Sequence, residues 1–314
     1  MATHTIIGAG AVGSGTARLL ADAGHDVIIV TRSGSGPDHP AITLVAADAT
    51  DADRLTHIAT GSETIYNCAN PPAYHKWAQL WPPMAAAILT AAKRTGARLV
   101  TMSNLYGYAV GSSPMRATDP LDPPTDNGRI RVRMWTEVMA AHREGRVRAT
   151  EVRASDYVGP GLGGTAHLAD RFVPPVVAGK TARTFGSPEI AHSWTYIDDV
   201  CRTLATVGTD ARADGRAWHV PTLPPKTAQE MADRFAAAAG APSAKVAQLP
   251  RAVLRVVALF VPLVRSLMET AYQFDAPFEL AAEDTTATFG IEPTPLKEQV
   301  AATLAAYGVE QVSV

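Results

Sequence analysis

The chain has 314 residues, of which 46% are hydrophobic and 18% charged, and its 28 basic residues nearly balance its 30 acidic ones. This composition is typical of a folded globular protein and excludes a disordered chain. Because the basic residues are scattered rather than clustered, nothing in the sequence indicates a nucleic-acid partner or an anionic membrane partner.

The N-terminus and the cysteines favour a cytoplasmic protein without a metal. Thr3 to Ile7 leads directly into a glycine-rich turn, with no basic segment and long apolar run of the kind found in signal peptides. Cys68 and Cys201 are far apart in the sequence, so a disulfide has no support. The nine histidines are spread singly, without the spacing of metal ligands.

Apolar segments of strand length alternate with longer helical patterns through the first half of the chain. Continuous apolar runs predict strands that are buried on both faces, as in a parallel sheet covered by helices. The predicted strands are Thr5 to Ile7, Val27 to Val30, Ile42 to Ala46, Thr64 to Cys68, Arg98 to Met102 and Ala149 to Arg153. The predicted helices are Val12 to Ala23, Ala52 to Ile58, Tyr74 to Thr95 and Ile130 to Arg143. The expected fold class is therefore α/β, with residues 1–160 forming a Rossmann-type, doubly wound parallel sheet.

Residues 161–314 follow a looser pattern and are expected to form a smaller, mainly helical substrate-binding lobe, partly interleaved with the first. Short segments rich in Pro and Gly precede an alanine-rich helix from Thr227 to Ala239. The stretch from Trp194 to Leu204 is predicted as a strand, a turn and a helix, so residues 194–207 are expected to complete the main sheet. Within it, Asp199 is expected to cap the helix and Asp198 to be solvated or paired locally.

Ala252 to Val264 is the most apolar stretch of the sequence. Arginines at 251, 255 and 265 bound or interrupt it and Pro262 breaks it, so it is well short of the roughly 20 residues that span a bilayer. We expect an amphipathic helix packed on the body of the protein. A mobile lid or a membrane-surface segment is the alternative.

Residues 8–13 read Gly-Ala-Gly-Ala-Val-Gly between the first predicted strand and the first predicted helix. In this context the pattern predicts a dinucleotide site. Gly8 would make the tight turn, Gly10 would let the backbone approach the pyrophosphate, and Gly13 would allow close packing of helix on strand. An ordinary strand–helix turn is the alternative, because glycine-rich turns are common.

The end of the second predicted strand favours NADP over NAD. An acidic residue there would accept hydrogen bonds from the ribose 2′-hydroxyl, whereas a cation pairs with a 2′-phosphate. Here Arg32 offers a planar guanidinium suited to phosphate, with Ser33 as a second donor. An ordinary surface arginine is the alternative.

Two further strand ends complete the predicted cofactor site. Asp48 follows the third strand and could accept a hydrogen bond from the adenine amino group, while Asp51 would cap the next helix. Small residues after the fourth strand would let the chain pass the ribose and phosphates. The predicted cofactor-binding residues are Gly8, Gly10, Ala11, Val12, Gly13, Arg32, Ser33, Asp48, Ala69, Asn70 and Ala154.

With these motifs, the chain resembles the short-chain dehydrogenase/reductase superfamily, specifically the extended or atypical branch that includes NAD-dependent epimerases and dehydratases of nucleotide sugars. The resemblance rests on the glycine turn at Gly8, the strand end at Asp48, Val100 to Gly107, Arg153 to Gly161, and Trp194 to Val200. It covers nearly the whole chain. It implies a nicotinamide cofactor across the carboxyl edge of the sheet, with the substrate between the cofactor and the C-terminal lobe.

The resemblance places Ser103 where the family polarises a substrate carbonyl, but the family's Tyr-x-x-x-Lys is missing. In the family the Tyr is the general acid/base, and the Lys lowers its pKa and holds the nicotinamide ribose. Here Asn127 to Arg133 reads Asn-Gly-Arg-Ile-Arg-Val-Arg. Arg131, four residues after Asn127, is expected in the role of the lysine, and Arg133 is the alternative if Glu137 fixes the pairing.

Another side chain has to supply the proton, because arginine, with a pKa above about 12, is a poor proton donor. Tyr106, Tyr157 and Tyr74 are the candidates in that order, and a core or rim aromatic is the alternative for each. The predicted catalytic residues are Ser103, Tyr106 and Arg131, and the predicted substrate-binding residues are Tyr74, Asn104, Tyr157 and His192.

The leading hypothesis is an NADP-dependent oxidoreductase acting on a carbonyl or hydroxyl substrate. One alternative is a nucleotide-sugar epimerase or dehydratase, whose diphosphate could bind Arg129 to Arg133, Arg171 or Arg183. Another is a catalytically silent, NADP-sensing regulator, as the loss of the tyrosine would allow. The expected partner is a small-molecule substrate, and a homodimer is left open.

Overall fold

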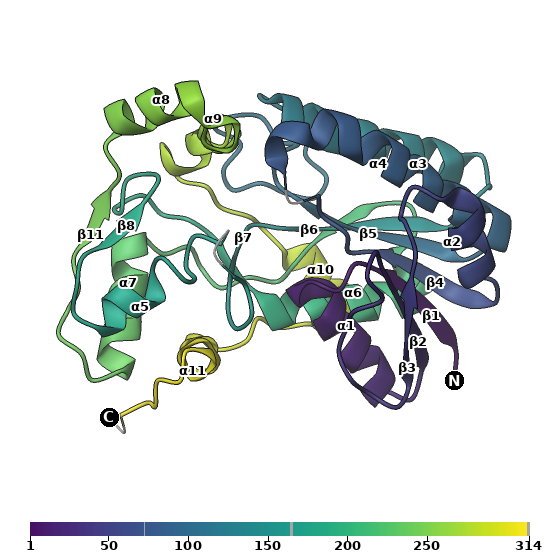
Figure 1. The fold of residues 1–314 in the computed structure, drawn as a ribbon, viewed down its shortest axis with the longest axis horizontal. Coiled ribbons are helices and arrows are strands. Elements are labelled where there is room, and N and C mark those ends of the chain that lie inside the picture. The colour runs from purple at the N-terminus through teal and green to yellow at the C-terminus, as the bar shows by residue number, and fades with distance from the viewer. Residues whose placement is uncertain (72, 164–165, 313–314) are drawn as a thin grey trace.

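The computed structural model of the chain describes residues 1–71, 73–163 and 166–312. Its central feature is a parallel sheet of seven strands in the order β10-β6-β5-β4-β1-β2-β3 (Figure 1). The strands are β1 (Thr3–Ile7), β2 (Asp26–Thr31), β3 (Ile42–Ala46), β4 (Ser62–Asn67), β5 (Arg98–Asn104), β6 (Ala149–Ala154) and β10 (Ala217–His219). The α/β class and the doubly wound sheet are confirmed, and the six strands predicted from continuous apolar runs are all present.

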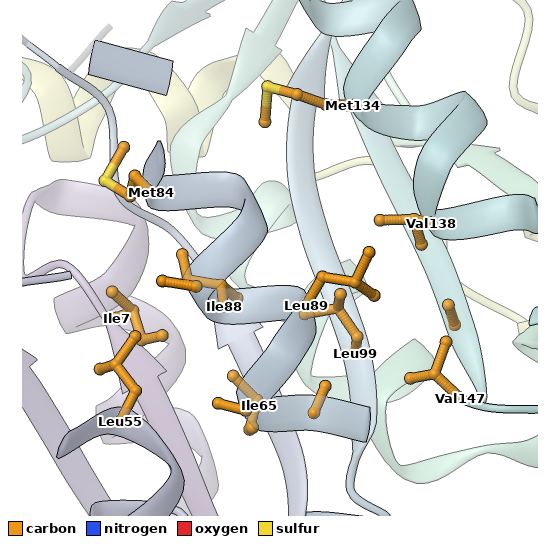
Figure 2. Packing of buried hydrophobic residues seen from close by; sticks show 14 of the residues in the cluster. Ile7, Leu55, Ile65, Met84, Ile88, Leu89, Leu99, Met134, Val138 and Val147 are labelled. Atoms are coloured by element: carbon orange, nitrogen blue, oxygen red, sulfur yellow. The ribbon is translucent and has the colours of Figure 1, made fainter. Parts of the chain in front are cut away.

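Helices cover both faces of the sheet, which explains why its strands are apolar throughout. On one face lie α2 (Ala52–Ile58), α3 (Trp77–Thr95) and α4 (Asp126–Arg143), and on the other α1 (Ala11–Asp22) packs against α6 (Ile197–Thr209) (Figure 1). Figure 2 shows the core of the first face, where Ile65 and Leu99 from the strands meet Ile88 and Val138 from the helices.

Capping decides where the helices of the first face begin. Asp51 caps α2 as predicted, since its side chain accepts a hydrogen bond from the Arg54 N–H. The predicted helix from Tyr74 divides into a short 3-10 turn, η1 (Tyr74–Lys76), and α3. Thr125 caps α4 by accepting from the Gly128 N–H at 3.1 Å, so this helix begins four residues before the predicted start.

A second lobe with its own apolar core follows β6. Its strands pair as β7 (Asp156–Val158) with β9 (Trp194–Tyr196) and β8 (Ala182–Thr184) with β11 (Val246–Gln248). Its remaining elements are α5 (Val173–Val177), α7 (Ala228–Ala238), α8 (Arg251–Phe260), α9 (Pro262–Glu269), α10 (Glu283–Phe289), α11 (Leu296–Ala306) and the 3-10 turns η2 (Ala211–Ala213) and η3 (Ala271–Phe274). Phe172 and Phe235 are fully buried where α5 and α7 meet.

Residues 194–207 do not complete the main sheet, contrary to the expectation. Ser155 separates β6 from β7 and its N–H donates to Thr195 Oγ1 at 3.2 Å, so the chain leaves the main sheet and pairs with β9 in a separate ribbon. The seventh strand is β10, which pairs with the outer edge of β6. Helix α6, which follows β9, covers the sheet beside α1 instead.

The expectation that Asp199 caps α6 is also wrong. Asp199 lies inside the first turn of α6, whose cap position is Tyr196, and it is completely buried. Its carboxylate accepts hydrogen bonds from Thr294 N at 2.9 Å and from Thr294 Oγ1 at 2.6 Å. The side chain therefore tethers the segment before α11 to the Rossmann sheet.

The predicted apolar helix exists, but it packs on the body only along a narrow edge. It divides into α8 and α9 at Val261 and Pro262, and within α8 only Ala258 is buried. Most of its large apolar side chains are exposed, which differs from the expected packing. Among the described residues no helix is both long enough and apolar enough to cross a membrane.

A buried ion pair ties α6 and η2 to the strand β5. The side chain of Arg98 is 2% exposed and that of Asp214 is 17% exposed. The Arg98 Nε–H donates to Asp214 Oδ1 at 2.7 Å, and Nη1 donates to the Gly208 carbonyl at 2.8 Å. Removing one partner of a buried pair leaves the other charge uncompensated.

We therefore predict that Asp214→Ala lowers the free energy of unfolding by about 3 kcal/mol. The control is Arg94→Ala, which breaks the exposed Arg94–Asp53 pair and should cost less than about 1 kcal/mol. Urea unfolding followed by circular dichroism measures both values. Equal losses of unfolding free energy for the two variants would show that Asp214 is not needed to compensate the buried charge of Arg98.

Candidate active site

The site lies where the strand order of the sheet reverses. Strands β2 and β3 lie on one side of β1, and β4, β5 and β6 lie on the other, so the carboxyl ends of β1 and β4 diverge into a crevice. A cavity of about 410 Å³ opens there. Its walls come from the segments after β1, β4, β5 and β6, from α4, and from the second lobe at residues 161–163, Ala166, Gln273 and Phe278.

The glycine turn after β1 packs closely at two positions and is open at the third. Gly8 has φ +100°, and a β-carbon there would lie 2.9 Å from the Ala69 backbone. A β-carbon at Gly13 would lie 2.0 Å from the Gly8 carbonyl oxygen. A β-carbon at Gly10 would have no other atom within 4 Å, and no side chain caps α1. The first N–H groups of α1 therefore face open space at the cavity, as a phosphate site requires.

Most of the predicted site residues line this one cavity. They are Gly10, Ala11, Val12, Ala69, Asn70, Tyr74, Ser103, Asn104, Tyr106, Arg131, Ala154 and Tyr157. Gly8 and Gly13 lie behind the wall, where they allow the close packing of the turn. Arg32, Ser33 and Asp48 are outside the cavity at the ends of β2 and β3, and His192 lies behind Asp156.

The side chains at the ends of β2 and β3 differ in how many hydrogen-bond or ion-pair partners they already have within the protein. Arg32 is exposed and has no ion-pair partner among the described residues. The Ser33 hydroxyl shares a hydrogen bond of 2.8 Å with Ser35. Asp48 Oδ1 accepts from both Thr50 N and Thr50 Oγ1 at 2.8 Å, and these bonds lower the pKa of Asp48. Of the three side chains, Arg32 therefore has the fewest contacts within the protein to break before it binds a ligand.

Arg131 is a buried cation at the floor of the cavity. Its guanidinium carbon lies 4.2 Å from the centre of the Trp81 ring and 5.0 Å from that of Trp77, which is cation–π distance. Its hydrogen bonds are long, 3.3 Å to Asn70 Oδ1 and 3.5 Å to the Met102 carbonyl, and Nε has no partner. Burial lowers its pKa, and no carboxylate pairs with it in the described part of the chain. A bound anion or polar group would satisfy it.

Of the two arginines proposed for the role of the lysine, only Arg131 lines the cavity. Arg131 points to the cavity from α4, whereas Arg133 is exposed on the solvent side of the same helix. Asn127, one turn before Arg131, is buried at the position that carries the tyrosine in the resembled pattern. The helix thus brings a cation, but no phenol, to the cavity.

Three phenols reach the cavity from other segments. Tyr74 stacks on Trp77 with ring centres 4.5 Å apart, and Tyr106 lies over the same indole at 6.3 Å. Tyr157 enters from β7. Burial raises the pKa of all three, so each stays protonated at neutral pH and can donate to a carbonyl oxygen.

Sequence reasoning missed a carboxylate in the cavity wall. Asp156 lies within the Arg153 to Gly161 motif but no pattern singled it out. Its Oδ2 accepts from His192 Nε2 at 2.8 Å, and its Oδ1 lies 3.7 Å from His167 Nε2. Burial opposes its charge, but the two histidines hold the pKa of Asp156 below its usual value. The carboxylate can thus accept a hydrogen bond from a substrate hydroxyl, while His192 acts only through it.

Comparison with known proteins now identifies the family. The model of the NAD dependent epimerase/dehydratase family matches residues 5–220. The chain belongs to this family. It is therefore an enzyme of the extended short-chain dehydrogenase/reductase branch, as the sequence motifs predicted. Comparison with curated protein sequences gave no significant match.

Solved structures similar to this epimerase/dehydratase-family chain extend over almost its whole length. An epimerase from Methanothermobacter thermautotrophicus has 19% identity and a TM-score of 0.81, with 98% of this chain and 92% of that one covered. The enzyme WbmH from Bordetella bronchiseptica, solved with NAD⁺, has 22% identity, coverage of 98% and 99%, and a TM-score of 0.71. The dTDP-glucose 4,6-dehydratase DesIV from Streptomyces venezuelae, solved with NAD, has 20% identity, coverage of 98% and 97%, and a TM-score of 0.75.

The cavity residues fit the dinucleotide cofactor of this family. Gly10 and the free N–H groups of α1 suit a pyrophosphate, and the unsatisfied Arg131 suits the ribose or phosphate of the nicotinamide half. In the part of the chain that the structure describes, no group of three or more His, Cys, Asp or Glu side chains is arranged to hold a metal.

The open space at Gly10 gives a test of the phosphate site. We predict that Gly10→Val folds normally, because its φ of −70° suits any residue and no atom crowds its β-carbon. The valine side chain would fill the space where phosphate approaches, so the dissociation constants for NADH and NADPH should both rise more than about tenfold. Fluorescence titration and the thermal midpoint check the two parts. A stable variant with unchanged affinity would place the pyrophosphate elsewhere.

Proposed function

We propose that the protein is an NADP-dependent oxidoreductase that acts on a carbonyl or hydroxyl group of a small, uncharged substrate. The observation that carries this proposal is the charge of the cavity wall. Arg131 is the one cation among the lining residues described, and it lies on the floor of the cavity. Of the second-lobe residues that line the cavity, Leu162, Ala166, Gln273 and Phe278 are uncharged, and Asp156 on β7 is the one acidic residue in the described lining.

The preference for NADP rests on Arg32. It is exposed at the end of β2 without an ion-pair partner among the described residues, and β2 itself ends without the acidic residue that would accept from a ribose 2′-hydroxyl. A guanidinium can bind the 2′-phosphate through two parallel hydrogen bonds. Two of the structural neighbours named above, WbmH and DesIV, were solved with NAD, so the choice of NADP depends on this strand end alone.

The proton chemistry would fall to the phenols and to Ser103. When bound, the nicotinamide supplies or accepts a hydride. Ser103, at the carboxyl end of β5, would donate to the substrate oxygen together with Tyr106. Because burial keeps Tyr106 protonated, the site is set to give a proton to a developing alkoxide rather than to take one from an alcohol. We therefore expect carbonyl reduction to be the faster direction at neutral pH.

A nucleotide-sugar epimerase or dehydratase is the second candidate. Its support is the similarity over 98% of the chain to the UDP-glucose 4-epimerase of Thermotoga maritima, solved with UDP-glucose, at 17% identity and a TM-score of 0.78. Of the arginines proposed for the diphosphate, only Arg131 lines the cavity, whereas Arg171 and Arg183 are exposed outside it, which weakens this candidate. Asp156 would also repel an anionic substrate.

The cofactor preference gives one direct test. We predict that Arg32→Ala weakens NADPH binding about 10- to 100-fold, the equivalent of a lost charge-assisted hydrogen bond, while NADH binding changes less than about twofold. The matched control is Arg143→Ala, an exposed arginine at the far end of α4. Fluorescence titrations with both nucleotides measure the effect. An equal loss for NADPH and NADH would refute pairing with the 2′-phosphate.

Turnover distinguishes the oxidoreductase from a silent NADP-sensing regulator. We predict steady NADPH oxidation with at least one member of a panel of aldehydes and ketones, and a fall in kcat of about 100-fold for Tyr106→Phe with NADPH affinity unchanged. Tyr74→Phe and Tyr157→Phe serve as matched controls at the same cavity. Tight NADPH binding without turnover of any aldehyde, ketone or nucleotide sugar would support the regulator. An unaffected Tyr106→Phe enzyme would move the proton donor to another phenol.

A further inference from the structure

A row of buried polar side chains lies on the sheet where α3 and α4 cover it. Asn67, Thr101 and Glu151 stand in register on β4, β5 and β6. Two positions earlier on the same face the side chains are apolar, with Ile65 on β4 and Leu99 on β5 (Figure 2). The residues of α3 and α4 that lie over the row are mostly apolar. Because a buried polar group without a hydrogen bond is costly, the row needs partners that the helices do not supply.

Two small cavities border Glu151, each with a volume of about 10 Å³. This is about the volume that admits a single water molecule. The first cavity, which we call the Asn67 space, has Asn67, Thr101 and Glu151 in its lining. The second, which we call the Ser103 space, has Ser103, Arg131 and Glu151 in its lining. Ser103 and Arg131 also line the main cavity, so the Ser103 space lies directly behind the candidate active site.

Each space has in its lining a residue with a buried polar atom that lacks a hydrogen bond within the described chain. This atom is Oδ1 of Asn67 at the Asn67 space and Nε of Arg131 at the Ser103 space. Glu151 is common to both spaces. Its Oε1 accepts from Arg153 Nε at 2.6 Å, and an ionised carboxylate has room for about three further hydrogen bonds. A water molecule both donates and accepts, so in either space it can join Glu151 to the unsatisfied atom.

We propose that Glu151 directs the hydroxyl hydrogen of Ser103 toward the substrate through a water molecule in the Ser103 space. This role rests on the proposed function, in which Ser103 donates to the substrate oxygen. The water accepts from Arg131 Nε–H, donates one hydrogen to Glu151 and donates the other to Ser103 Oγ. A hydroxyl that accepts from behind keeps its single hydrogen for the main cavity. Glu151 is thus a positioning residue and does not touch the substrate.

The two charges on either side of the Ser103 space fix the orientation of the water. A guanidinium only donates, and the Glu151 carboxylate, paired with Arg153, only accepts, so the water cannot reverse. Burial lowers the pKa of Arg131 and Glu151 opposes this shift, as expected of two charges that lie close together. The bridge uses only Nε of Arg131. Its two Nη atoms make only long hydrogen bonds and stay available to a ligand.

A crystal structure of the wild-type protein with NADPH tests the water directly. We expect an ordered water within hydrogen-bond distance of Glu151, Arg131 Nε and Ser103 Oγ. A Ser103 space that holds no water at a resolution that shows ordered solvent would overturn the proposal. This result does not depend on turnover, so it separates a failure of the bridge from a failure of the proposed function.

The variant Glu151→Gln tests the effect on catalysis. Its amide can donate to the water, which then no longer has to donate to Ser103. We expect kcat for carbonyl reduction to fall about tenfold, while KM and the NADPH dissociation constant change less than about twofold. In a Ser103→Ala background the same substitution should change kcat less than about twofold, because the hydroxyl that it positions is absent. Equal falls in the two backgrounds would refute the positioning role.

The matched control is Tyr108→Phe, which disturbs the same buried arginine from another side. Tyr108 OH accepts from Arg153 Nη1 at 2.7 Å, and Tyr108 is not among the described residues that line either space. This variant should lower the thermal midpoint, as Glu151→Gln should, but keep kcat within about twofold of the wild type. An equal fall in kcat for both variants would assign the effect to Arg153 and refute the water bridge. If Glu151→Gln does not fold, the wild-type crystal structure decides.

Discussion

The contact between the Gly8 carbonyl and Gly13 fixes the rest of the site. A β-carbon at residue 13 would lie 2.0 Å from that oxygen, so only glycine lets α1 start directly against the end of β1. Gly8 in turn must take a positive φ, because its turn passes against the Ala69 backbone at the end of β4. Close packing at these two glycines leaves Gly10 facing open space. The other cavity walls, from the segments after β4, β5 and β6 and from α4, enclose the space in front of Gly10.

The chemistry of the cavity follows from what α4 lacks. Without a tyrosine at position 127, the helix delivers only the Arg131 cation, and the phenols come from η1, from the loop after β5 and from β7. Arg131 is partly compensated by the faces of two indoles rather than by a carboxylate. Such a cation lowers the energy of an anionic ligand group more than a paired one would, because no bridge has to be broken first. The phenols keep their protons because burial raises their pKa, and for Tyr74 and Tyr106 the nearby Asp156 carboxylate raises it further.

The sequence was sufficient for the elements whose signal is local. Continuous apolar runs located six strands, Asp51 marked a helix start, and the glycine turn with its flanking strand and helix indicated a cofactor site before any fold was known. Twelve of the predicted site residues line one cavity, and most of them stand at or just after the carboxyl end of a strand of the main sheet, positions that the parallel topology brings together.

What the sequence did not reveal depends on contacts between distant segments. Asp156 and His192 are separated by 36 positions, and only the pairing of β7 with β9 brings them to 2.8 Å. Asp199 has the local appearance of a helix cap, yet its partner, Thr294, is 95 residues away. Such pairs have no spacing rule, since the turns and loops between them can take any length.

Helix α8 shows the same limit for an apolar pattern. Periodicity identifies which side of a helix is apolar, but not whether the protein has a surface to cover that side. Here α9 and η1 take the contact that would have buried it, so the apolar side faces outwards and the small residue Ala258 faces in.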